Sequence, residues 1–88
     1  MARQIFIVDA HVVDKNGTFN FLDDYPKKFD SNNYSGNVDK TKRRAEGDMS
    51  EVWGAMCKVD ERQIQTVSLY TVDGFLLESK TMGQFPSE

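Results

Sequence analysis

The chain has 88 residues, of which 39% are hydrophobic and 28% are charged, and its formal net charge at pH 7 is −3. Such a composition is typical of one folded domain, which we place at 1–88. The acidic balance disfavours a general affinity for nucleic acid or for anionic membranes. No apolar run is long enough to cross a membrane, and the short run near the start breaks at Asp9, too soon for a signal peptide. We therefore expect a soluble, cytoplasmic protein without a membrane partner.

Residues 4–14 alternate in the manner of a β-strand, and their even positions form the more apolar face. The Asn16-Gly17 dipeptide that follows is a strong signal for a two-residue hairpin turn, because both residues tolerate a positive φ. Such a turn pairs Val12 with Phe21 and Asp14 with Phe19. Both phenylalanines then lie on the apolar face, and this agreement supports the register.

Residues 23–36 are rich in Pro, Gly, Asn, Asp and Ser, and this content predicts a loop. The segment also contains three aromatic residues: Tyr25, Phe29 and Tyr34. One interpretation is that these rings attach the loop to the edge of the core. The alternative is a recognition surface in which Lys27 and Lys28 lie beside stacking rings.

Residues 37–59 have the only long helical pattern in the chain. Asn37 is the expected N-cap, and Asp39 suits the positive end of the helix dipole. Trp53 borders the apolar face and is expected to anchor the helix to the sheet. The apolar residues recur at the spacing of one helix face. They are Val38, Ala45, Met49, Val52, Met56 and Val59.

Two glycines lie inside this helical pattern, at Gly47 and Gly54. Each costs about 1 kcal/mol relative to alanine in a helix. With Ser50 between them, they form a stripe of small residues that lets another backbone approach closely. The sequence favours one continuous helix, and the alternative is a break at Gly47 into the pieces 37–46 and 48–59.

Residues 62–72 are rich in β-branched residues and tyrosine, which predicts another strand. Asp73-Gly74 predicts a second two-residue turn, which pairs Tyr70 with Leu77 and Ser68 with Ser79. One face of this hairpin then holds Ile64, Tyr70, Val72, Phe75 and Leu77. The other face holds Val67, Leu69 and Leu76.

The resulting order is β-β-α-β-β, an α+β fold in which two hairpins build an antiparallel sheet on one central helix. One helix covers one face of a sheet, whereas both faces here carry apolar side chains. Exposed apolar patches of this size usually mark an interface, and the simplest partner is a second copy of the chain. The predicted self-association face consists of Ile5, Ile7, Val13, Val67, Leu69 and Leu76.

Few residues are suited to catalysis or to metal binding. His11 is the only histidine and Cys57 the only cysteine, and nothing in the sequence brings them together. Asp9 and His11 share one side of a strand, where they form a surface pair or, alternatively, part of a metal site. No phosphate loop, dinucleotide-binding or zinc motif occurs. We therefore predict no enzyme activity, no cofactor and no metal.

A basic cluster opens the predicted helix. Glu46 and Asp48 are placed to pair with Lys42 and Arg44 at i, i+4 spacing, which predicts a self-paired, solvated face. The alternatives are contact with a phosphate backbone or with an acidic protein. The candidate surface for either partner consists of Lys40, Lys42, Arg43, Arg44, Lys27, Lys28, Tyr25 and Tyr34.

Taken together, these patterns favour a small interaction or scaffold module that forms a homodimer and binds an unidentified protein partner. A nucleic-acid-binding accessory protein that uses the basic cluster and the loop aromatics is the first alternative. A metal- or cysteine-dependent enzyme is the second.

Overall fold

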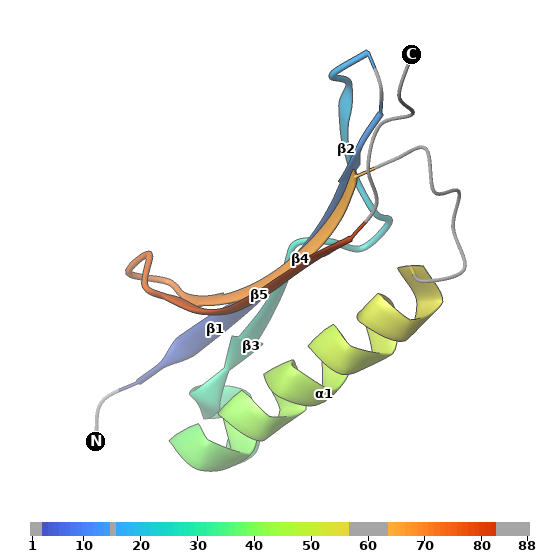
Figure 1. Ribbon diagram of the computed structural model, residues 1–88. Coiled ribbons are helices and arrows are strands. Elements are labelled where there is room, and N and C mark those ends of the chain that lie inside the picture. The colour runs from blue at the N-terminus through green and yellow to red at the C-terminus, as the bar shows by residue number, and fades with distance from the viewer. Residues whose placement is uncertain (1–2, 15, 57–63, 83–88) are drawn as a thin grey trace.

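The computed structural model describes residues 3–14, 16–56 and 64–82, which form one antiparallel sheet with one α-helix on one of its faces (Figure 1). The elements are β1 (Ile5–Val13), β2 (Phe19–Phe21), β3 (Lys27–Asp30), the 3-10 helix η1 (Ser31–Tyr34), α1 (Val38–Met56), β4 (Ile64–Thr71) and β5 (Leu76–Met82). The expected α+β class is confirmed, and the order is β-β-β-α-β-β because the chain has one strand more than predicted.

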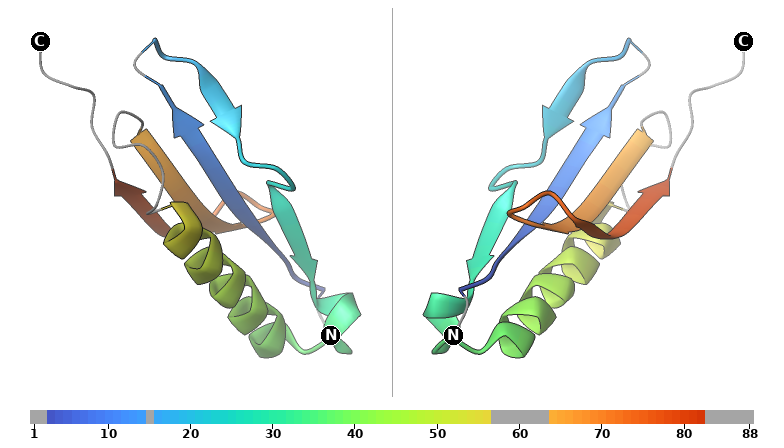
Figure 2. Two further views of the ribbon diagram at one scale, coloured as in Figure 1. Left: turned by 90° about the vertical axis from the view of Figure 1, so that its right-hand side faces the viewer. Right: turned by 90° about the vertical axis from the view of Figure 1, so that its left-hand side faces the viewer.

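The central strand of the sheet is β1. On one side it pairs with β4, which in turn pairs with β5. On its other side, β2 and β3 follow one another: β2 pairs with the end of β1 and β3 with its start (Figure 2). All of these pairings are antiparallel.

The core lies between α1 and the face of the sheet that carries the even positions of β1. The register of β1 with β4 sets Val8 opposite Leu69 and Ala10 opposite Val67. Side chains directly opposite one another in a sheet lie on the same face, so these four residues share the core. The buried apolar residues are Phe6, Val8, Ala10, Ala45, Met49, Val52, Val67 and Leu69.

This register corrects the predicted self-association face. Val67 and Leu69 are 0% and 1% exposed beneath α1, so they are not part of an exposed face. Ile64 and Tyr70, which were expected on the opposite side from them, pair with Val13 and Ile7 and lie on the face away from the helix. The residue pattern within each hairpin does not show which face of β4 lies beside the apolar face of β1. The sequence analysis therefore placed Val67 and Leu69 on the wrong face of the sheet.

The helix is continuous through Gly47, so the alternative of two pieces is wrong. Asn37 caps it as predicted, since the Asn37 Oδ1 accepts a hydrogen bond of 3.0 Å from the Lys40 backbone N–H. Thr41 lies fully buried on the core side, and Trp53 packs half-buried against the core. Val38 is exposed, and Val59 lies outside the described residues.

The first hairpin has a register one residue away from the predicted one. His11 pairs with Phe21 and Val13 with Phe19. The Asp14 Oδ1 accepts hydrogen bonds of 2.9 Å from the backbone N–H groups of both Asn16 and Thr18, and this side-chain cap supports a longer turn. Because the shift is one residue, both phenylalanines lie on the face away from α1.

The second hairpin follows the predicted register from Gln65 to Leu69, with Ser68 opposite Ser79. The register shifts beyond Leu69, so that Tyr70 pairs with Leu76 and Leu77 becomes an extra residue. Such a bulge bends the strand and increases its twist. The hairpin accordingly curves away from the helix (Figure 1).

The segment 23–36 is not a loop throughout, because it contains β3 and η1. Phe29 pairs with Phe6, which places its ring on the core side of the sheet. Tyr25 and Phe29 both pack against the core, as the first interpretation of this segment expected.

The corrected face of β4 can be tested by replacing Leu69. We expect Leu69→Ala to lower the free energy of unfolding by about 2–5 kcal/mol, because it leaves a cavity in the core. Val38→Ala, the control at the exposed start of α1, should change it by less than about 0.5 kcal/mol. Urea unfolding followed by circular dichroism measures both, and equal losses would place Leu69 outside the core.

Candidate functional site

The face of the sheet that α1 does not cover, here called the open face, is the first candidate surface. No element within residues 3–14, 16–56 and 64–82 packs over it (Figures 1 and 2). Its residues alternate along β1 and β4 with those of the core. The open face consists of Ile5, Ile7, Asp9, His11, Val13, Phe19, Phe21, Lys28, Asp30, Ile64, Thr66, Ser68, Tyr70, Leu76, Ser79 and Thr81.

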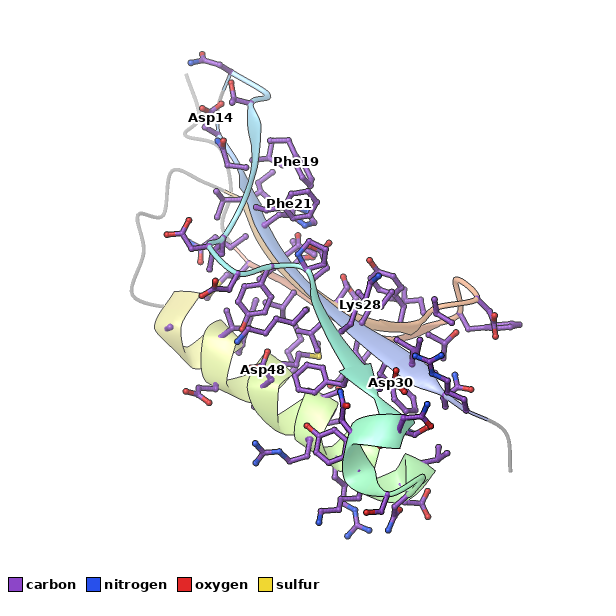
Figure 3. The ribbon with its side chains drawn as sticks, turned by 180° about the vertical axis from the view of Figure 1, so that it is seen from behind. Asp14, Phe19, Phe21, Lys28, Asp30 and Asp48 are labelled. Atoms are coloured by element: carbon purple, nitrogen blue, oxygen red, sulfur yellow. The ribbon has the colours of Figure 1, made fainter. Side chains whose placement is uncertain are left out.

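An aromatic cluster, composed of His11, Phe19 and Phe21, occupies one end of the open face. The His11 ring stacks on the Phe19 ring, with centroids 4.4 Å apart and an angle of 28° between the ring planes. Phe21 meets both rings edge-on, at centroid distances of 6.2 Å from His11 and 4.8 Å from Phe19. Figure 3 shows both phenylalanines projecting away from the helix. About half of each phenylalanine is nevertheless exposed to water.

The centre of the open face is polar. His11 Nδ1 lies 3.1 Å from Asp9 Oδ2, so the structure brings these two residues together as a pair. The other oxygen, Asp9 Oδ1, is buried and has no hydrogen-bond partner among the described residues. Burial raises the pKa of Tyr70, and the nearby negative charge of Asp9 adds to that increase. Opposite Asp9, the hydroxyls of Ser68 and Ser79 lie 3.3 Å apart.

At the other end of the sheet, the tip of the β4–β5 hairpin forms an apolar arm. We use this name for Val72, Phe75, Leu76 and Leu77. Their exposed fractions are 53%, 71%, 64% and 43%, so a large part of each residue is in contact with water. Apolar patches of this kind on a small domain usually belong to an interaction site.

Four of the six residues predicted for self-association lie on the open face, and the self-association itself stays a prediction. Ile5, Ile7 and Val13 lie on the open face, and Leu76 lies opposite Tyr70 on the same face. The sequence reasoning missed the phenylalanines of β2, Tyr70 and Ile64. Asp14 is the residue that could have indicated where the phenylalanines lie. Its side chain is well suited to capping a turn, and the capped turn sets their register.

The second candidate surface is the one predicted for nucleic acid or a protein partner, and its residues do not lie together in the structure. Lys40, Lys42, Arg43 and Arg44 are all exposed. The predicted pairs of Lys42 with Glu46 and of Arg44 with Asp48 are wrong: among the described residues, no carboxylate forms an ion pair with these four bases. Arg43 Nε donates only to the Asp39 carbonyl, at 3.5 Å.

Asp48 instead binds two residues from the segment before β3 and from β3 itself. The Tyr25 hydroxyl donates to Asp48 Oδ2 at 2.9 Å, and Lys27 Nζ lies 3.3 Å from Asp48 Oδ1. Lys27 Nζ also lies 5.0 Å from the centre of the Tyr25 ring. Tyr25 and Lys27 thus serve to attach the sheet to the helix, which leaves them poorly placed to bind a partner.

Lys28 and Tyr34 lie apart from this contact. Lys28 pairs with Ile7 and therefore belongs to the open face, whereas Tyr34 is half-buried in η1. The eight residues of this predicted surface therefore do not form one patch.

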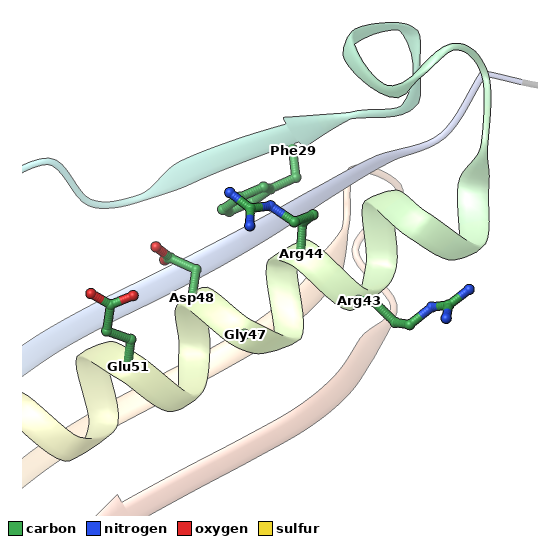
Figure 4. A pocket seen from close by; sticks show the side chains of 6 residues that line it. All are labelled: Phe29, Arg43, Arg44, Gly47, Asp48 and Glu51. Carbon is green, nitrogen blue, oxygen red and sulfur yellow. The ribbon is translucent and has the colours of Figure 1, made fainter.

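A depression of about 240 Å³ lies between α1 and β3 (Figure 4). Its lining mixes two basic and two acidic side chains with one aromatic ring and one glycine: Arg43, Arg44, Asp48, Glu51, Phe29 and Gly47. Figure 4 shows Arg43 directed away from the acidic side chains. With balanced charges, this depression has no clear preference for an anion or a cation.

The possible metal ligands of the described residues do not gather into one cluster. No group of three His, Cys, Asp or Glu side chains lies close enough to hold an ion in that part of the chain. Cys57 lies outside the described residues.

Comparisons with protein-family models, with curated proteins and with solved structures find no match to this chain. In the part of the chain that the structure describes, no helix has the length and apolar character that crossing a membrane requires.

The contact between Tyr25 and Asp48 leads to a prediction about alkaline pH. Burial, together with the hydrogen bond to Asp48, raises the pKa of Tyr25 well above its usual range. The folded state thus favours the protonated phenol, and this contribution to stability is present below about pH 10 and is lost as the pH rises above it.

We therefore expect Tyr25→Phe to cost about 1–2 kcal/mol at pH 7 and to lose less stability than the wild type between pH 9 and 11. Urea unfolding at several pH values measures both effects. Tyr34→Phe is the matched control, because it also removes one phenolic hydroxyl. Equal behaviour of the two variants would contradict a role for the bond to Asp48.

Proposed function

We propose that this chain is a small interaction module that forms a homodimer through its open face. The observation that supports the proposal is the apolar and aromatic character of a sheet face that no described element covers. An antiparallel sheet with one face on a helix normally presents polar side chains on its other face. Here that face carries isoleucines, the aromatic cluster and Leu76 of the apolar arm, all of which gain from removal from water.

The charge balance of the open face favours a second copy as the partner. Along its paired segments, Asp9 and Asp30 provide two negative charges, and Lys28 and Arg3 provide two positive charges. A face without net charge does not repel an identical face. Nucleic acid, by contrast, is bound by a surplus of basic side chains.

The small size of the core supports the same proposal. Eight apolar residues are buried in the described part of the chain, and all of them lie in one layer between α1 and the sheet. Small domains bury a low fraction of their surface, and association with a second copy adds to their stability by mass action.

The proposal predicts twice the mass of the 10.1 kDa chain in solution, measured by light scattering over a wide concentration range. Ile7→Asp places a charge in the middle of the open face and should yield a monomer with an unchanged circular dichroism spectrum. Val38→Asp is the matched control, because Val38 is an exposed apolar residue at the start of α1. A wild type that is monomeric at every concentration would refute the proposal.

A second candidate function is nucleic-acid binding by the start of α1. The observation that favours it is that Lys40, Lys42, Arg43 and Arg44 are exposed without carboxylate partners among the described residues. Binding of this kind releases counterions, so the affinity must fall steeply as salt rises.

We expect a fluorescently labelled single-stranded oligonucleotide to bind, if this function holds, with an affinity that drops at least about tenfold between 50 and 200 mM salt. Replacing Arg43 and Arg44 together by Ala should weaken binding, whereas Lys80→Ala on β5 serves as the control. Absence of binding to both DNA and RNA at low salt would eliminate this candidate.

A further inference from the structure

We infer that two copies of this chain also associate side by side, through antiparallel pairing of their β5 strands. The contact lies at the outer edge of β5, so the inference goes beyond the proposed open-face dimer and uses a different surface. It joins two sheets into one continuous sheet, with both helices on the same side.

The outer edge of β5 is the longest edge of the sheet that a second strand can join. In the part of the chain that the structure describes, β5 pairs with β4 and with no other strand (Figure 2). It has 7 residues, whereas β2 and β3, along the opposite edge, have 3 and 4. Its residues from Leu76 to Thr81 are all exposed. An edge strand presents backbone N–H and C=O groups that its one neighbour does not use, and a second strand binds to them.

Symmetry limits the registers that two β5 strands can adopt. Identical antiparallel strands in one sheet are related by a two-fold axis perpendicular to the sheet, and this axis keeps each side chain on its own face. A residue therefore lies opposite a residue of the same face, and the axis passes beside one central residue. The regular ladder of β5 with β4 covers 78–82, because Leu77 is the extra residue of the bulge.

The charges of β5 select the register that is centred on Ser79. It is the one register that sets Glu78 of each copy opposite Lys80 of the other, so the pair of strands contains two pairs of opposite charges. A centre at Glu78 or at Lys80 would set like charges directly opposite each other, which is destabilising. In the selected register, Leu77 lies opposite Thr81 of the other copy. The stretch 77–81 thus complements its own reversed copy.

Hydroxyl groups on the open face support the same register. Ser79 lies opposite Ser68, and their hydroxyl oxygens are 3.3 Å apart. With the axis beside Ser79, the Ser79 residues of the two copies lie opposite each other. The row of serines then continues from one sheet into the next. Hydroxyls both donate and accept, and such pairs across strands add to the stability of a sheet.

The same residues disfavour other strands as partners. Charged side chains on an edge strand, lysine above all, hinder pairing with an unrelated strand, and a bulge ends the ladder. A reversed copy of β5 matches both Glu78 and Lys80, so the edge is selective for a second copy of this chain. Because the paired stretch is short and mostly polar, we expect it to form at a higher protein concentration than the open-face dimer.

Charge reversal tests the register, in an Ile7→Asp background that removes the open-face contact. Glu78→Lys alone opposes lysines in both pairs, and Lys80→Glu alone opposes glutamates. Both residues are exposed, and neither forms an ion pair among the described residues, so we expect both variants to fold. Sedimentation equilibrium up to millimolar concentration should show that each dissociation constant rises at least about tenfold above that of Ile7→Asp.

An equal mixture of the two variants should dimerise again, with a dissociation constant within about threefold of that of Ile7→Asp. In the mixed dimer, one chain has lysine at both positions and the other has glutamate, so both pairs again carry opposite charges. A mixture that associates no better than its components overturns the inference.

Lys42→Glu with Glu51→Lys is the matched control pair. These exposed residues of α1 give the two variants the same net charges as the β5 pair. We expect this pair to associate as Ile7→Asp does, alone and mixed. If mixing strengthened its association equally, net charge and not the β5 register would be the cause, and the inference would fail.

A disulfide locates the symmetry axis. In an Ile7→Asp background, Cys57→Ser removes the only cysteine of the chain. Ser79→Cys then places two thiols opposite each other, and mild oxidation should link the two copies. Thr81→Cys is the matched control on the same strand and face, because its two copies are about 14 Å apart in this register. Equal linkage of both variants, or preferential linkage of Thr81→Cys, would contradict the register.

The outcomes separate this inference from the proposed function. If Ile7→Asp stays monomeric at every concentration while the wild type dimerises, the open face is the interface and the β5 pairing is wrong. If Ile7→Asp dimerises as tightly as the wild type and the charge reversals weaken both, β5 is the interface and the open-face dimer is wrong. If both hold, the mass of the wild type rises above two chains only where Ile7→Asp dimerises.

Discussion

The pairing of β1 with β4 is the constraint on which the rest of this structure depends. Because strand side chains alternate with a period of two, the register that sets Val8 opposite Leu69 decides which half of each strand is buried. It assembles the apolar positions of two strands, distant in sequence, into a surface that one helix can cover. A shift by one residue would exchange the core of β4 with its exposed side.

Because α1 covers one face of the sheet, it leaves the opposite face uncovered. The chain has a single described α-helix, and its contact through Asp48 with Tyr25 and Lys27 holds it on the core side of β1 and β3. Nothing in the described part of the chain covers the opposite face, although isoleucine and aromatic residues line it. The described part of the chain therefore leaves apolar residues of this face uncovered, and this imbalance is the basis of the proposed interaction.

A local hydrogen bond determines much of the character of that face. The Asp14 carboxylate caps the first turn, and the resulting register places Phe19 and Phe21 beside His11 instead of in the core. At the second hairpin, the extra residue Leu77 bends the arm away from α1. Two small departures from regular hairpins thus shape both ends of the open face.

The amino-acid sequence by itself determined the α+β class, the helix with its Asn37 cap, the apolar face of β1 and the pairing of Ser68 with Ser79. These features depend on periodicity, capping and turn preferences, which act between residues close in the chain. Only the tertiary structure decided that Val67 and Leu69 face the helix, that β3 joins the sheet, and that Asp48 contacts Tyr25 instead of Arg44. Each of these depends on which distant segments meet, and contacts between distant segments leave no periodic trace in a single sequence.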